Sequence, residues 1–66
     1  MSRYIAIANE HVAACAALNW AWMSIRPMVL AEGDDPAEVA AIAEGKRGEE
    51  ITIIDTETHQ PSRWWE

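Results

Sequence analysis

A single cysteine, Cys15, in a chain of only 66 residues most strongly limits what this sequence can fold into. One thiol cannot form an intrachain disulfide, and a lone thiol is typical of a protein kept in a reducing cytoplasm. A domain of this length buries a small share of its surface, so its core leaves only about 3–5 kcal/mol of net stability. We therefore expect one domain, residues 1–66, that gains stability from a partner or a second copy.

The charge balance excludes some partners and favours others. The formal net charge is −6, so phosphate backbones repel the chain and we expect no direct nucleic-acid binding. The charge-free stretch from Val12 to Ile25 is too short to span a membrane. The opening MSRYIAIANEH lacks the long apolar segment and small-residue cleavage site of a signal peptide, so we expect none. These patterns indicate a cytoplasmic protein.

The clearest local signal is the segment DDPAEVAAIAEG. Asp35 is a preferred N-cap residue, Pro36 suits the first helical position, and Glu38 stands where it can reach back to the cap. Gly45 is expected to end the helix in a left-handed conformation. The other patterns are alternating apolar residues for strands and an alanine-rich run, capped by Asn9, for a helix. We expect helices at 10–26 and 36–45 and strands at 3–8, 28–32, 49–55 and 62–65.

These elements predict an α+β fold, with two helices packed on one face of a mainly antiparallel sheet. The sheet has four strands if residues 28–32 form one, and three otherwise. An alternative is a long strand over residues 17–31, paired with the first strand. The expected core consists of Ile5, Ile7, Leu18, Trp22, Ile25, Val39, Ile42, Ile51 and Ile53.

Two pairs of tryptophans suggest a contact surface. On one continuous helix, Trp20 and Trp22 are about 200° apart, so only Trp22 can join Leu18 and Ile25 in the core. Trp20 is then expected to contact a partner, beside a strip of alanines that would let another backbone approach closely. Adjacent strand residues also face opposite sides, so one tryptophan of the final pair is expected to be a contact. The candidate contact residues are Trp20, Ala13, Ala17, Ala21, Trp64 and Trp65.

No pattern in the sequence indicates catalysis, a metal or a cofactor. His11 and Cys15 are four residues apart, but with His59 they do not make up the four ligands of a zinc site. Cys15 lies among alanines, where burial makes a thiol unreactive. Ser2 stands where small tautomerases carry an N-terminal proline. We therefore expect a protein that is not an enzyme, with no catalytic or metal-binding residues and no cofactor.

Acidic residues dominate the second half of the chain. Between residues 32 and 57 there are nine acids and only two bases, Lys46 and Arg47. A field of this strength can steer a basic protein partner, although a solvated surface is the simpler explanation for any single acid. Glu44, Asp55 and Glu57 belong to the same field. The acids chosen as candidate partner-binding residues are Glu32, Asp34, Asp35, Glu38, Glu49 and Glu50.

From about residue 29 onward the chain resembles small phage accessory proteins of the anti-CRISPR kind. The resemblance lies in the order of DDPAEVAAIAEG, EEITIID, a polar turn and SRWWE. It implies a non-enzymatic inhibitor that occupies the surface of a host nuclease complex in the host cytoplasm. The alternative is a small structural or antitoxin-like regulatory subunit, stabilised by its partner or by homodimerisation.

Overall fold

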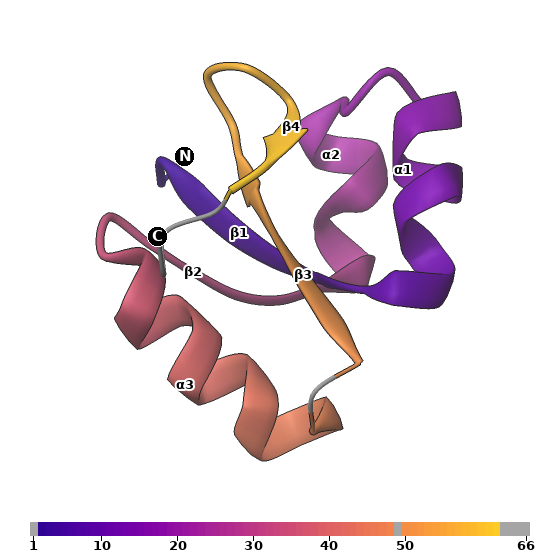
Figure 1. The fold of residues 1–66 in the computed structure, drawn as a ribbon. Coiled ribbons are helices and arrows are strands. Elements are labelled where there is room, and N and C mark those ends of the chain that lie inside the picture. Colours follow the sequence, from indigo (N-terminus) through magenta and orange to yellow (C-terminus); the bar gives the residue numbers. More distant parts are fainter. Residues whose placement is uncertain (1, 49, 63–66) are drawn as a thin grey trace.

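The first strand, β1 (Tyr4–Ala8), is one of two interior strands of the sheet and is buried on both faces. In the computed structural model, which describes residues 2–48 and 50–62, the sheet is antiparallel with the order β2-β1-β3-β4. Together with the helices it forms a small α+β domain, as the sequence predicts (Figure 1). The strands are β1 (Tyr4–Ala8), β2 (Val29–Gly33), β3 (Ile51–Asp55) and β4 (Gln60–Pro61), and the helices are α1 (Val12–Ala17), α2 (Trp22–Ile25) and α3 (Pro36–Arg47).

The helices cover opposite faces of the sheet, which corrects the expectation of a single covered face (Figure 1). Ile5 and Ile7 of β1 point toward α1 and α2, whereas Ala6, between them, packs against α3. Each of these three residues is at most 1% exposed. The alternation in β1 therefore separates large from small apolar residues, and both of its faces are buried.

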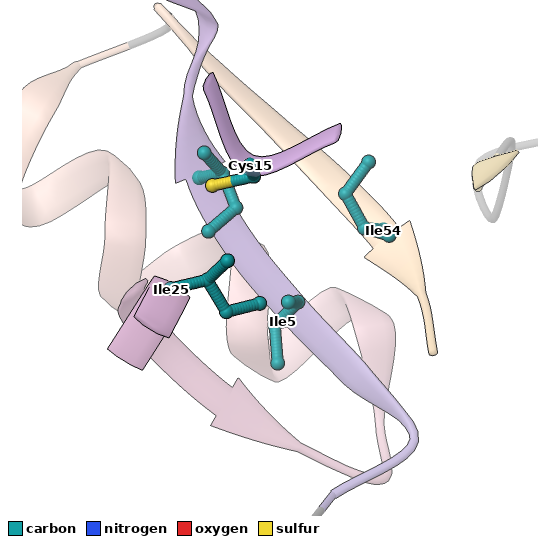
Figure 2. Close-up of a cluster of buried hydrophobic side chains, with 5 residues drawn as sticks. Ile5, Cys15, Ile25 and Ile54 are labelled. Carbon is teal, nitrogen blue, oxygen red and sulfur yellow. The ribbon is translucent and has the colours of Figure 1, made fainter. Parts of the chain in front are cut away.

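Two small cores result, one on each face. The first surrounds Ile5, Ile25 and Cys15 (Figure 2), and the second lies under α3. The prediction that Leu18 and Ile42 belong to the core is wrong, because these residues are 42% and 46% exposed. Trp22 and Ile51 are half-buried, and the remaining predicted core residues are buried: Ile5, Ile7, Ile25, Val39 and Ile53.

The predicted helix over residues 10–26 is divided. It begins as a 3₁₀ turn, continues as α1 and ends in a Schellman motif, in which Asn19 N donates to Ala16 O and Trp20 N donates to Cys15 O. Asn19 and Trp20 both have φ of 56°, in the left-handed region, and Ala21 is extended before α2 begins. A 3₁₀ turn at Arg26–Met28 then leads into β2. The alternative of a long strand over residues 17–31 is wrong.

Helix α3 begins as predicted but extends further. Asp35 Oδ1 accepts a hydrogen bond from Ala37 N at 3.0 Å, and Pro36 occupies the first turn. The helix continues through Gly45, contrary to the predicted stop there, and the left-handed residue that follows it is Gly48, with φ of 68°. Lys46 and Arg47 stabilise this last turn by bonding to Leu30 and Glu10. Gly45 faces open space and needs no special conformation.

Three sequence predictions fall on residues outside the described ranges. They are the contact role of Glu49 and the opposite placement of Trp64 and Trp65, together with most of the predicted strand at 62–65.

Candidate functional site

Arg3 joins the ends of two strands at one end of the sheet. Its backbone N donates to Asp34 Oδ1 at 3.2 Å, just beyond β2, and its Nη2 donates to Asp55 Oδ2 at 3.3 Å, at the end of β3. The Glu57 carboxylate lies 3.5 Å from the same nitrogen, and the guanidinium lies 5.3 Å from the centre of the Tyr4 ring. Arg3 therefore holds carboxylates from two distant parts of the chain close together.

The carboxylates around Arg3 define what we call the acidic end of the molecule. The strand register places Tyr4 opposite both Gly33 and Asp55, so the end of β2, the start of α3 and the end of β3 meet here. Among the described residues, Arg3 is the one lysine or arginine placed within this group. The acidic end consists of Glu32, Asp34, Asp35, Glu38, Asp55 and Glu57.

Hydrogen bonds fix the Asp55 carboxylate in its charged form. The backbone N of Glu57 donates to Asp55 Oδ1 at 2.9 Å, and this bond is the main cause of a lowered Asp55 pKa. The bond from Arg3 lowers the Asp55 pKa further, while partial desolvation opposes the change. The same contact with Asp55, with the nearby Glu57 charge, raises the pKa of Arg3. Both groups remain ionised at neutral pH.

The other lysines and arginines in the described ranges lie toward the opposite end of the sheet. Arg26 precedes β2, and Lys46 and Arg47 occupy the last turn of α3. Arg47 forms an ion pair with Glu10, and Lys46 Nζ donates to Leu30 O at 2.7 Å. The described part of the molecule is thus electrically asymmetric, with one strongly negative end.

The structure brings four of the predicted acidic contact residues together and separates a fifth. Glu32, Asp34, Asp35 and Glu38 all belong to the acidic end. Glu50 lies at the other end of β3, where its carbonyl accepts a hydrogen bond from Asn9 N at 3.1 Å. Asp55 and Glu57 belong to the acidic end but were not among the predicted contact residues. Pairing the start of the first strand with the end of the third would have revealed them.

The predicted contact surface, Trp20 with a strip of alanines beside it, does not form as expected. Ala13 and Ala17 are exposed on α1, but Ala21 lies outside that helix, in extended backbone. Trp20 and Trp22 are both half-buried and pack against the same core, so the expectation that Trp20 points away from this core is wrong, while its contact with a partner stays a prediction. Trp20 also stacks on His59, with ring centroids 5.8 Å apart.

No family model, curated protein or solved structure matches the chain.

Other features of the described residues indicate little chemistry. Cys15 is completely buried, and desolvation raises the pKa of its thiol. Within residues 2–48 and 50–62, no group of three His, Cys, Asp or Glu side chains is placed to hold a metal ion. A shallow pocket is lined by Asn9, Glu10, Arg47 and Glu50, and three of these side chains are already bonded, Glu10 to Arg47 and Asn9 to Thr52. No helix in the described part of the chain is long and apolar enough to cross a membrane.

Proposed function

We propose that this chain is a non-enzymatic protein-binding module that inhibits a nucleic-acid-handling complex by occupying its basic surface. The observation that carries the proposal is the acidic end, where six carboxylates gather at one end of the sheet and, among the described lysines and arginines, only Arg3 lies with them. A basic protein surface that normally binds phosphates is complementary to such a concentration of negative charge. The resemblance of the chain from about residue 29 onward to anti-CRISPR proteins agrees with this role in the cytoplasm of a host cell.

The rigidity of the acidic end supports binding to a fixed pattern of positive charge. Asp34 and Asp55 are hydrogen-bonded to Arg3, and Asp35 is bonded to the first turn of α3. These three carboxylates are therefore held in place before any partner arrives, which reduces the entropy lost on binding. Glu32 and Glu38 are exposed, and within the described ranges they form no ion pair. Their charges are available to a partner.

The proposal is tested by competition with DNA. The immobilised chain is expected to capture basic, nucleic-acid-binding proteins from a host lysate, and double-stranded DNA or raised salt should release them. The double variant Glu32→Gln/Glu38→Gln should capture much less, because it removes two free charges without touching a structural hydrogen bond. Glu44→Gln, at the far end of α3, is the matched control and should capture as much as the wild type.

Two results would contradict this function. One is a captured partner that DNA does not displace, because such a partner is not bound through its phosphate-binding surface. The other is equal loss of capture in the double variant and in Glu44→Gln, because the acidic end would then have no special role.

A second candidate function is a regulatory subunit that is stabilised by its partner or by homodimerisation. It is favoured by exposed apolar side chains on the charge-free stretch, where Met23 is 79% exposed and Leu18 is 42% exposed. Analytical ultracentrifugation of the chain alone tests self-association through these side chains. A wild-type dimer that Met23→Gln converts to a monomer would support this function. A monomeric wild type would exclude homodimerisation. A toxin or enzyme gene next to the coding sequence would favour the subunit, whereas phage genes would favour the inhibitor.

A further inference from the structure

We propose that the outer edge of β2 binds an extended, basic segment of a partner protein as an additional strand of the sheet. This inference rests on the proposed function, because it specifies how a basic partner engages the acidic end.

The two edges of the sheet differ in their capacity to accept another strand. β4 contains two residues, and Pro61 lacks the backbone N–H that strand pairing requires. β2 has five residues and no proline, and within residues 2–48 and 50–62 no strand pairs with its outer edge. An unpaired strand of this length is a template on which an extended peptide can form main-chain hydrogen bonds.

Only part of β2 is open to such pairing. The register with β1 shifts between Ala6 and Ile7, which leaves Leu30 as an extra residue in β2. Lys46 Nζ then donates to the Leu30 carbonyl at 2.7 Å, so this carbonyl is already bonded. A lysine at a sheet edge is a common obstacle to strand pairing. The open segment is therefore Ala31–Gly33, which leads directly into the acidic end.

Carboxylates lie on both sides of this open segment. Glu32 is paired with Ile5 across the strands, and paired residues share a face, so Glu32 belongs to the face covered by α1 and α2. Glu38 belongs to α3, on the opposite face. An added strand with lysine or arginine at successive positions would place positive charge near both carboxylates.

An apolar side chain borders the same edge. Ile42 is 46% exposed and lies one helical turn from both Glu38 and Lys46 on the surface of α3. Because Lys46 reaches Leu30, this strip of α3 runs alongside β2. A strand added to β2 therefore has an apolar contact at Ile42 as well as a charged one at Glu38.

The charge of the edge decides between a basic peptide and a second copy of this chain. If two copies paired through β2, each would bring Glu32, Asp34 and Asp35 toward the same residues of the other. Like charges placed opposite one another destabilise a strand pair, whereas opposite charges stabilise it. The complementary occupant is a basic, extended segment.

The test compares two synthetic peptides with identical side chains. The first has two adjacent lysines flanked by valines over about seven residues, so that its lysines face both sides of the added strand, and the second has the same sequence with every backbone nitrogen methylated. Methylation preserves the charge but removes the N–H donors. We expect the unmethylated peptide to bind at least about tenfold more tightly, and hydrogen exchange of the backbone amides in Val29–Gly33 to slow when it binds. Glu32→Gln should weaken its binding about threefold or more, whereas the control Glu44→Gln should not.

Three other results would contradict different parts of the proposal. Equal binding of the two peptides would overturn strand addition while leaving an acidic binding surface in place. Binding of neither peptide at low salt would contradict the proposed function as well. A dimer of the free chain with slowed amide exchange in β2 would show that the edge belongs to a second copy, and would overturn the choice of a basic peptide.

Discussion

The indole of Trp20 stacks on the imidazole of His59, with 13° between the ring planes. Trp20 lies in the connection between α1 and α2, and His59 lies in the turn between β3 and β4. The contact therefore links two connections that are far apart in the sequence, and it places Trp20 over the core on that face of the sheet.

Replacing Trp20 should destabilise the isolated chain. We expect Trp20→Ala to lower the free energy of unfolding by about 2–3 kcal/mol, somewhat less than for a fully buried tryptophan, because the side chain is half-buried. Trp22→Ala should cost a similar amount, since both indoles pack against one core. Urea denaturation measures both values. A Trp20→Ala variant as stable as the wild type would mean that the indole contributes nothing to folding.

The ring stack itself can be isolated with a double-mutant cycle. His59 has φ of 57°, so asparagine, which tolerates this conformation, is the suitable replacement. We expect Trp20→Ala and His59→Asn to be coupled by about 0.5–1.5 kcal/mol, the usual range for an aromatic pair. Additive effects of the two changes would show that the stacked geometry has no energetic value.

Two substitutions at Asn19, at the end of α1, should have opposite effects on stability. The left-handed φ of 56° is easily adopted by glycine, so Asn19→Gly should be neutral or stabilising by up to about 1 kcal/mol. Asn19→Val should destabilise by about 1–2 kcal/mol, because a β-branched residue is strained there. Thermal unfolding of the two variants should place their midpoints on opposite sides of the Asn19→Ala midpoint. The reverse order would contradict the assigned helix end.

The start of α3 depends on the side chain of Asp35. Removing its oxygen in Asp35→Ala leaves the Ala37 N–H without its capping acceptor, and we expect a loss of about 1 kcal/mol. Asp35→Ser supplies another capping oxygen and should restore most of this loss. Urea denaturation of both variants provides the measurement, and equal stability of the alanine and serine variants would contradict the role of the cap.

Asp55 should make stability depend on pH in acid. Its pKa is lower in the folded chain than the ordinary value of 3.8, chiefly because Glu57 N donates to it, so the unfolded chain binds the proton more tightly. The stabilisation is complete above the ordinary pKa and is lost as the pH falls through the lower folded-state pKa. The stability difference between wild type and Asp55→Asn should therefore shrink below about pH 4. A difference that stays constant from pH 7 to pH 2 would contradict this linkage.

The N-terminal cap of α3 was the most reliable guide that the sequence offered, because Asp35 and Pro36 act through local hydrogen bonding and backbone geometry. The break between α1 and α2 was missed because an alanine-rich composition favours helix, while the left-handed conformation of Asn19 and Trp20 outweighs it. Asn19 was a readable signal, since asparagine is common at helix ends. The two-sided burial of β1 depends on distant partners, so alternation alone could not predict it.

The acidic residues from Glu32 to Glu38 were predictable as a group because they are neighbours in the sequence. Their meeting with Asp55 was not, since it depends on the antiparallel register of β1 with both β2 and β3. Glu50 is separated from the acidic end for the same reason, because it precedes β3, and the two ends of β3 lie at opposite ends of the sheet.

The position of β1 between β2 and β3 also determines when the protein can fold during its synthesis. β1 is made first, and β2 can pair with one of its edges early, but its other edge stays bare until Ile51–Asp55 has been made. Until then Ile5 and Ile7 lack the cover of Ile54. A growing chain therefore keeps this apolar surface exposed until β3 has been made, and can complete its cores only after that.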